Sequence, residues 1–369
     1  MLGVLLSSVM IGSVVGGAKT LYRSLSPDKK SGLRTEEEWE DFLNSIDISN
    51  KSSERIYFIR YESEDKVILG VPYGIAEHDI KNREPYFKIF MECETLEYKV
   101  YNGYLVMKFY RDKLPEKVEY DINNEILGLN DIIIDIGVSR DNNAIINFNK
   151  TPHLLIAGAT GSGKSVMTHC ILTQLYRRYP ELKFYLADMK KVELMNYKNL
   201  KNTIKYVDNV NDVSEMVKEL MEECDRRYEL IGKQGCKKME TYNKKVPKRL
   251  RLNPIVFVVE ECVRLVSDKQ LQKDLAELLF IARACGIYVI MTIQRPTKAC
   301  LSPEIKASLG NIIGLKTVNK KNSECICDDM RLKDLRGFGH GWLWNDLGEV
   351  EFQGYYIDED KIDEYVKEL

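Results

Sequence analysis

The chain has 369 residues, more than one hydrophobic core usually holds, so we expect two or three folding units. Hydrophobic residues make up 44% and charged residues 30% of the chain, a composition that excludes an intrinsically disordered protein. The formal net charge of −2 excludes a globally basic nucleic-acid binder, so any contact with nucleic acid must come from local lysines and arginines.

The first residues form an uncharged apolar stretch, LGVLLSSVMIGSVVGGA at 2–18. As a helix this stretch would span about 26 Å, slightly less than the ~30 Å hydrocarbon core of a bilayer, and Lys19 and Arg23 could snorkel to its interface. We interpret 1–23 as a hydrophobic helix that either anchors the chain in the cell membrane or docks on protein. As an anchor it would leave the rest of the chain in the cytoplasm, because basic residues follow it.

Residues 24–54 are polar and are predicted to form a tether with one short helix, which begins at the capping box Thr35–Glu38. A small α+β domain is expected at 55–127. Its pattern predicts helical structure between about Ala76 and Glu94 and three strands, at 56–61, 66–71 and 104–110. We find no catalytic constellation in this domain.

A larger domain is expected at 128–369, and its central feature follows a short apolar strand at 154–157. Gly158–Ser165 fits G-x-x-x-x-G-K-[ST] at every position, with glycines that let backbone N–H groups turn towards phosphate oxygens. We expect Lys164 to reach the β- and γ-phosphates of ATP and the Ser165 hydroxyl to ligate Mg²⁺. A glycine-rich turn without ligand is disfavoured, because the motif is complete and joins a strand to a helix. The predicted nucleotide-binding residues are Gly158, Ala159, Thr160, Gly161, Ser162, Gly163, Lys164, Ser165 and Val166.

Strands and helices alternate after this loop, which predicts an α/β fold with a mainly parallel, doubly wound sheet. The predicted strands end in Asp188, in Glu260–Glu261 and in Gln294, at the edge where such sheets bind ligands. We expect Glu260 to hold Mg²⁺ through water, Glu261 to polarise the attacking water and Gln294 to sense the γ-phosphate. A pair of glutamates seen alone is more often solvated surface, and Gln294 alone a loop cap, but the phosphate loop upstream favours the catalytic interpretation.

The nine cysteines include no C-x-x-C, and the four histidines form no spaced ligand pair. We therefore expect reduced, mostly buried thiols rather than a structural zinc site.

Four segments, in order, resemble FtsK/SpoIIIE DNA translocases. TPHLLIAGATGSGKSV resembles the phosphate loop of that family, and ADMKKVELMNY (187–197) its D-P-K-x-x-E-L motif, with Met189 in the proline position. ECDRRYELIGKQGCKKMETYNKKV (223–246) and IARACGIYVIMTIQRP (281–296) are similar to two further segments of the family. The resemblance extends over roughly 130–357.

This resemblance implies a RecA-like P-loop ATPase that forms a hexameric ring and threads DNA, duplex rather than single-stranded, by ATP hydrolysis at subunit interfaces. Arg283 matches the position of an arginine finger acting in trans, and Arg295 and Lys320 match pore contacts with the DNA backbone. Each of the three could instead be a solvated surface cation. The basic stretch 233–251 either lines the DNA path or is a solvated helix and linker. The short architecture resembles a translocase of a mobile element or phage, or a conjugative coupling protein, which would have a relaxase or another element-encoded partner.

Three positions depart from the family pattern. Glu260 replaces the usual Asp, and its extra methylene could slow turnover because Mg²⁺ demands near-ideal octahedral geometry. Ile293 replaces a Thr before Gln294, and Glu324 stands where a basic residue is expected.

Two other functions compete with DNA translocation. A membrane-anchored ATPase that energises protein secretion would share the motor and the anchor. A regulatory nucleotide switch is disfavoured, because the nearest guanine-reading segment, Asn319–Asn322, lacks the terminal Asp.

Overall fold

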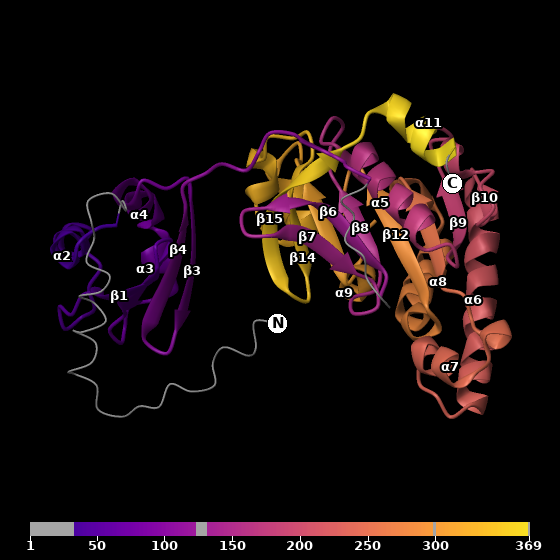
Figure 1. The fold of residues 1–369 in the computed structure, drawn as a ribbon, viewed down its shortest axis with the longest axis horizontal. Helices are drawn as coiled ribbons and strands as arrows, with labels where there is room; N and C mark the ends of the chain where they lie inside the picture. Colours follow the sequence, from indigo (N-terminus) through magenta and orange to yellow (C-terminus); the bar gives the residue numbers. More distant parts are fainter. Residues whose placement is uncertain (1–32, 123–130, 298–299, 368–369) are drawn as a thin grey trace. The chain divides into compact units, whose positions relative to one another are not determined.

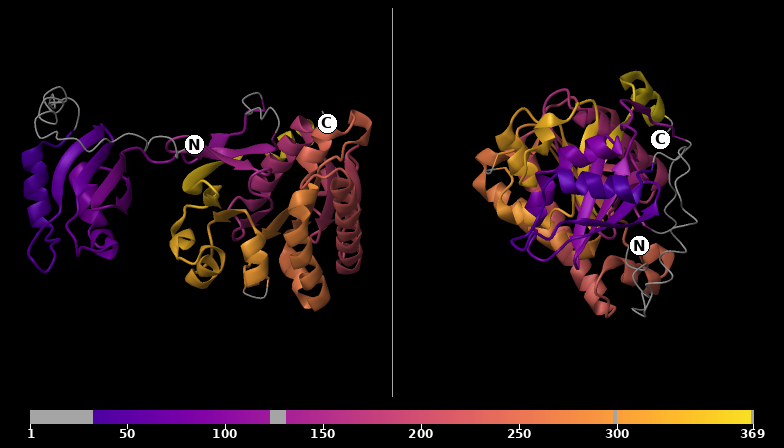
Figure 2. Two further views of the ribbon diagram at one scale, coloured as in Figure 1. Left: turned by 90° about the horizontal axis from the view of Figure 1, so that it is seen from below. Right: turned by 90° about the vertical axis from the view of Figure 1, so that its left-hand side faces the viewer.

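The computed structural model describes residues 33–122, 131–297 and 300–367 (Figures 1 and 2). The predicted hydrophobic helix at 1–23 lies outside these ranges, and none of the helices within them is long and apolar enough to cross a membrane. The chain forms two compact units divided between Lys113 and Leu114, earlier than the predicted boundary at 127/128. The reason is that β5 (Val118–Glu119) pairs in parallel with the last strand of the second unit.

The first unit is a four-stranded antiparallel sheet, in the order β1-β2-β4-β3, with three helices packed on one of its faces. The predicted helical stretch is two short helices, and a strand that the alternation did not predict, β3, precedes β4. The elements are α2 (Glu36–Ser45), β1 (Tyr57–Ser63), β2 (Lys66–Gly70), α3 (Glu77–Lys81), α4 (Glu84–Met91), β3 (Thr95–Tyr101) and β4 (Tyr104–Tyr110).

The described part of the predicted tether, 33–54, belongs to this first unit. The capping box of Thr35 and Glu38 is present and starts α2 as expected. Trp39 of α2 is fully buried, stacks on Phe58 of β1 and donates its indole N–H to the Tyr61 hydroxyl at 2.8 Å. A side chain with this much apolar area holds α2 on the sheet, so α2 is part of the core rather than of a linker.

The second unit confirms the predicted α/β class. Its strands are β5, β6 (Ile133–Ser139), β7 (Asn143–Asn147), β8 (Leu154–Ala157), β9 (Lys183–Asp188), β10 (Thr203–Val207), β11 (Ile255–Glu260), β12 (Ile287–Ile293), β13 (Asn311–Leu315), β14 (His340–Asn345) and β15 (Gly348–Tyr356). Its α-helices are α5 (Lys164–Arg178), α6 (Val210–Lys233), α7 (Met239–Lys245), α8 (Lys269–Ile281), α9 (Pro303–Ser308), α10 (Lys320–Cys327) and α11 (Glu359–Lys367). Short 3₁₀ turns join them: η1 (Met195–Tyr197), η2 (Lys248–Leu250), η3 (Cys262–Ser267), η4 (Ala282–Cys285) and η5 (Arg331–Asp334).

All of these strands belong to one sheet, whose order is β10-β9-β11-β12-β8-β13-β14-β15-β6-β7, with β5 paired to β15. The run from β10 to β13 is parallel, and β14, β15, β6 and β7 continue it antiparallel. α5 and α11 cover one face, and α6, α8, α9 and α10 cover the other (Figure 1). Because both faces are covered, β8, β11 and β12 are buried along their whole length, which explains their continuous apolar sequences.

This topology determines where the predicted site residues meet. β9, β11, β12, β8 and β13 are neighbours and run in the same direction, so their carboxyl ends lie along one edge. β9 and β11 end at Asp188 and Glu260, and Glu261, Gln294 and the phosphate loop directly follow β11, β12 and β8.

Candidate functional site

The phosphate loop is fixed between the two strands that flank β8. The Gly158 N–H donates to the Ile293 carbonyl at 3.1 Å, and the Ala159 N–H donates to the Lys316 carbonyl at 2.8 Å. Gly163 has a φ of +98°, and a Cβ at that position would lie 2.5 Å from the backbone nitrogen of Gly339. Only glycine fits there, and α5 starts at the next residue, so the positive end of its dipole faces the loop.

Lys164 is paired with a buried carboxylate. Its Nζ lies 3.2 Å from Oε1 of Glu260, and the side chains of Lys164 and Glu260 are 6% and 2% exposed. Lys190 places its own Nζ 3.2 Å from the same oxygen and 3.6 Å from Oε2 of Glu261. Two cations thus offset two carboxylates, which lowers the cost of burying all four charges.

Each of the two glutamates has one carboxylate oxygen that could accept a further ligand. Oε2 of Glu260 and Oε2 of Glu261 are buried and accept no hydrogen bond from the described residues. A carboxylate oxygen buried without a donor is costly, so these oxygens are suited to a bound cation, water or nucleotide.

Glu261 has a left-handed backbone, with a φ of +56°, which is strained for a residue with a side chain. Two hydrogen bonds hold it: its N–H donates to the Thr292 hydroxyl at 2.9 Å, and its Oε1 accepts from the Gln294 N–H at 3.2 Å. The Gln294 side-chain amide in turn contacts the Thr160 hydroxyl of the phosphate loop. Gln294 therefore connects the predicted water-activating carboxylate with the loop that faces it.

Ile293 lacks the hydroxyl of the Thr expected before Gln294, but the preceding residue, Thr292, has one that faces the site. Ile293 is buried and in register with Ala157 of β8, whereas the Thr292 hydroxyl reaches Glu261 and lies 3.4 Å from Oε1 of Glu260. The sequence did not single out Thr292.

Lys190 was also missed as a site residue, although it stands in the Lys position of the D-P-K-like motif. Asp188 folds the chain back so that Lys190 faces the glutamates: its carboxylate accepts from the N–H groups of Lys190, Lys191 and Leu194 at 3.2, 2.9 and 3.0 Å. Burial lowers the pKa of Lys190, but the attraction and hydrogen bond of Glu260, with Glu193 and Glu261, outweigh it and leave that pKa above its ordinary value. Lys190 is therefore a permanent cation of the site.

A cavity of about 670 Å³ opens beside these groups, large enough for a nucleoside triphosphate. Seven residues of the phosphate-loop region line it, namely Ala159, Thr160, Gly161, Gly163, Lys164, Ser165 and Val166. Lys190, Glu193 and Gln294 line the side of the carboxylates. Phe338, Tyr355, Tyr356 and Lys117 supply aromatic and cationic surface suited to a nucleobase. Of the predicted loop residues, Gly158 and Ser162 lie beneath this surface, where a Cβ on Gly158 would be 2.5 Å from the Ser162 hydroxyl oxygen.

The three predicted cations lie apart from this cavity. Arg283 is on η4, before the start of β12, and its guanidinium donates to the Lys150 carbonyl at 2.9 Å. β12 has seven residues, so Arg283 is on the order of 20 Å from the carboxyl edge. Arg295 is exposed on the loop that follows β12, and Lys320 is exposed as the first residue of α10. Asn322 of α10 links the helix to that loop by donating to the Pro296 carbonyl at 3.1 Å.

The basic stretch 233–251 contains the last residue of α6, the whole of α7 and η2. α7 packs beside the end of α6 (Figure 1), where Met239 lies against Gly286 at the start of β12. This stretch is therefore at the same edge as Arg283, opposite the phosphate loop.

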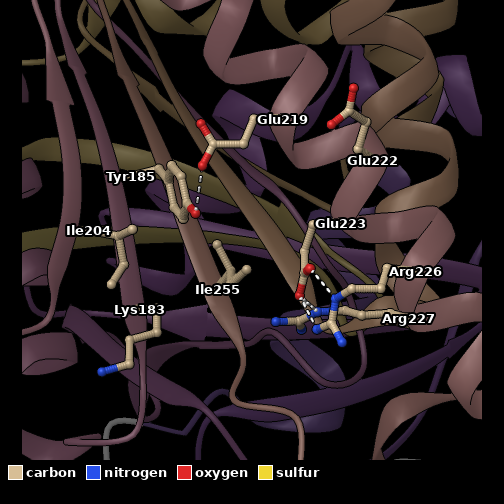
Figure 3. Close-up of a pocket in the computed structure, with 9 residues that line it drawn as sticks. All are labelled: Lys183, Tyr185, Ile204, Glu219, Glu222, Glu223, Arg226, Arg227 and Ile255. Atoms are coloured by element: carbon tan, nitrogen blue, oxygen red, sulfur yellow. Dashed lines mark hydrogen bonds and ion pairs between the residues drawn. The ribbon is translucent and has the colours of Figure 1, made fainter.

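A second cavity, of about 450 Å³, lies between α6 and the strands β9 and β11 and is lined by three acidic and three basic residues (Figure 3). Glu223 accepts from Arg226 and Arg227 at 2.6 and 2.7 Å, and Glu219 accepts from the Tyr185 hydroxyl at 3.2 Å. Burial and the nearby Glu219 raise the pKa of Tyr185 to about 12, so its hydroxyl stays protonated and keeps donating. We regard this cavity as structural, because the two arginines that line it are already paired with Glu223.

The phosphate loop, the opposed carboxylates and the D-P-K-like turn agree with a known family model. The model, described as the FtsK/SpoIIIE family, matches residues 130–335, more than half of the chain. The chain belongs to the FtsK/SpoIIIE family. Its fold is that of the RecA-like P-loop ATPases, as the sequence predicts.

Curated relatives agree with this assignment. DNA translocase FtsK of Treponema pallidum (strain Nichols) is 34% identical over 226 residues, which are 58% of this chain and 28% of that protein. DNA translocase SpoIIIE of Bacillus subtilis (strain 168) is 31% identical over 252 residues, which are 64% of this chain and 32% of that protein. The chain thus spans about a third or less of the length of these relatives.

Solved structures share the fold over much of the chain. The pCW3 conjugation coupling protein TcpA, in its monomer form with ATPγS, superposes with a TM-score of 0.64 at 24% identity, covering 90% of this chain and 98% of TcpA. EssC (ATPases 2 and 3) from Geobacillus thermodenitrificans gives a TM-score of 0.62 at 15% identity, covering 70% of this chain and 51% of EssC.

The charge balance around Glu260 leads to a prediction for Lys190. Without Lys190, Glu260 would hold Lys164 alone and more tightly, so Lys164 would be less available to phosphate. We expect Lys190→Met to lower kcat/KM for ATP at least tenfold, about 1.4 kcal/mol of transition-state stabilisation. Lys191→Met is the matched control, since the Lys191 side chain is 61% exposed and pairs with Asp208. Steady-state ATPase assays would contradict this account if Lys190→Met matched the wild type, or if both variants lost activity equally.

Proposed function

We propose that this chain is an ATP-driven DNA translocase, of the short type found in mobile elements or phages or among conjugative coupling proteins. The observation that carries the proposal is the complete phosphate loop facing two buried carboxylates across one cavity. The relatives named DNA translocase, at 31% and 34% identity, support DNA as the substrate.

In the hydrolytic step, the residues of the chain have separate tasks. Lys164 turns from Glu260 to the γ-phosphate and offsets the charge that develops there. Glu261 accepts a proton from the attacking water. Gln294 is hydrogen-bonded to both Glu261 and the phosphate loop, so its response to the γ-phosphate would be transmitted to both. Lys190 stays with Glu260 when Lys164 leaves, so that a buried carboxylate is not left unpaired.

Ser165 and Glu260 are the residues that would hold Mg²⁺, Glu260 through water. The unpartnered Oε2 of Glu260 fits this role, and water between the carboxylate and the ion leaves room for the extra methylene of a glutamate. When bound, Mg²⁺ would neutralise charge on the β- and γ-phosphate oxygens.

A homo-oligomeric ring, hexameric in our proposal, would supply an arginine to this cavity, since the described residues that line it include none. Arg283 is on the order of 20 Å from the carboxyl edge of its own sheet, too far to reach its own nucleotide. On a neighbouring subunit, the same edge would present Arg283 to the phosphate loop.

DNA would contact the exposed cations Arg295 and Lys320, which lie on the loop after β12 and at the start of α10, two segments that Asn322 links. This placement would couple changes at the γ-phosphate, sensed by Gln294, to the neighbouring Arg295.

We also propose that the motor acts in the cytoplasm and that 1–23 anchors it to the membrane, with a relaxase or another element-encoded protein as partner.

The proposed function predicts that DNA stimulates ATP hydrolysis by the full chain. Rates are compared with duplex DNA, with single-stranded DNA and without DNA, at 50 mM and 200 mM salt. We expect stimulation that falls steeply at the higher salt, because phosphate contacts release counterions. Lys164→Ala, which removes the charge facing the γ-phosphate, is the inactive control. Hydrolysis indifferent to DNA but raised by a protein substrate would instead favour the secretion ATPase.

The arginine finger is tested by mixing variants. Arg283→Ala should bind nucleotide normally and lose turnover, on the order of 10³-fold or more. Glu261→Gln should also be inactive alone, but mixed oligomers should regain part of the activity, because an intact Arg283 meets an intact Glu261 at some interfaces. An absence of rescue at every mixing ratio would contradict action in trans.

A further inference from the structure

The first unit carries a row of tyrosines across its open sheet face. Tyr57 pairs with Gly70, Gly70 with Tyr104, and Tyr104 with Tyr101, so the row crosses β1, β2, β4 and β3. Residues paired in register point to the same face of a sheet. The next residues along the strands, among them Phe58, Leu69 and Leu105, point to the opposite face and are buried under α2, α3 and α4.

These tyrosines are exposed rather than packed. Tyr57, Tyr101 and Tyr104 are 56%, 62% and 49% exposed. A Cβ on Gly70 would lie 2.2 Å from the Tyr57 ring, so the absence of a side chain at Gly70 lets that ring lie flat across β2. Three aromatic rings thus present their surface to solvent along one line.

The rows beside the tyrosines are basic. Arg60 and Lys99 lie in the next row on this face, on either side of Ile68 and Val106, and both are exposed. Lys66 and Lys108 lie in the row after that, together with Glu97, the only acidic residue among the registered positions of this face in the described strands. Lys66 and Lys108 are paired with Glu62 and Asp65. The face therefore combines stacking surface with two cations, Arg60 and Lys99, that form no ion pair with the residues that the structure describes.

This combination favours a polyanion with accessible aromatic rings. Base–aromatic stacking needs unpaired bases, which a duplex hides, and the basic rows suit the phosphates that run beside those bases. An apolar protein partner would not need the cations Arg60 and Lys99 beside the rings. The row spans three strand spacings, about 14 Å, which fits two or three nucleotides of an extended strand.

We propose that this face of the first unit, made of Tyr57, Tyr101, Tyr104, Arg60 and Lys99, binds single-stranded nucleic acid. The site is separate from the nucleotide cavity and from Arg295 and Lys320, and it does not depend on ATP. It would let the chain hold an unpaired strand while the motor acts on DNA.

The test is fluorescence anisotropy of a labelled twelve-nucleotide oligo-dT with the full chain and no ATP. We expect the double variant Tyr101→Ala/Tyr104→Ala to weaken binding at least tenfold, since each stacked base contributes substantially to affinity. Tyr101→Phe/Tyr104→Phe should bind as the wild type does, because it keeps the rings. Tyr86→Ala is the matched control, since Tyr86 is 54% exposed on α4, on the covered side of the sheet.

Charge is tested separately. Arg60→Glu/Lys99→Glu should weaken binding and reduce its salt dependence, whereas Lys81→Glu on α3 should not. Basal ATP hydrolysis without DNA should be unchanged in all these variants, which also shows that the chain is folded.

Three results would overturn the proposal: no binding of oligo-dT by the wild type, equal binding by the wild type and the double alanine variant, or a change of oligomeric mass in that variant with oligo-dT binding intact. The last result would assign the face to a protein partner. The outcome is independent of the translocase proposal, because a motor whose ATPase ignores DNA could still bind oligo-dT here, and a DNA-stimulated motor could fail to do so.

Discussion

The site depends on one buried oxygen, Oε1 of Glu260, which two lysines share at 3.2 Å each. The buried carboxylate of Glu260 needs a neighbouring cation to offset its charge. Lys164 provides one, but it has to move away from Glu260 when it binds a phosphate. Lys190 meets that need, because it can keep Glu260 paired while Lys164 moves. The turn held by Asp188 fixes Lys190 beside the end of β11, which carries Glu260. It therefore lowers the free energy needed to move Lys164 away from Glu260.

The parallel sheet explains why the phosphate loop meets Glu260, Glu261 and Gln294, and why Arg283 does not reach them. Neighbouring parallel strands deliver the phosphate loop, Glu260, Glu261 and Gln294 to a single edge, although they are far apart in the sequence. The same geometry sends Arg283 to the other edge, where it donates to a backbone carbonyl. A chain built in this way has its nucleotide cavity at one edge and its candidate arginine finger at the other, which is an arrangement suited to head-to-tail rings.

Much of the motor unit could be predicted, because its signals are local. The phosphate loop is contiguous, and the buried strands β8, β11 and β12 show as unbroken apolar runs that end in polar residues. Lys190 and Thr292 were missed because their roles depend on pairing between strands that the sequence does not specify. The tether prediction failed for 33–54 because polarity dominates that stretch, while the burial of Trp39 depends on Phe58 and Tyr61 of a later strand. The tyrosine row was equally hidden, since Tyr57, Tyr101 and Tyr104 come together only through the register of four strands.

The central claim is that the terminal phosphates of ATP lie between the amides of 158–165 and the carboxylates of Glu260 and Glu261. An experimental structure of the full chain with Mg²⁺ and ATPγS tests it most directly. The account predicts that Lys164 will have left Glu260 for the γ-phosphate, with Lys190 still paired to Glu260. A nucleotide bound outside this cavity, or one bound within it while the Lys164–Glu260 pair stays intact, would contradict it.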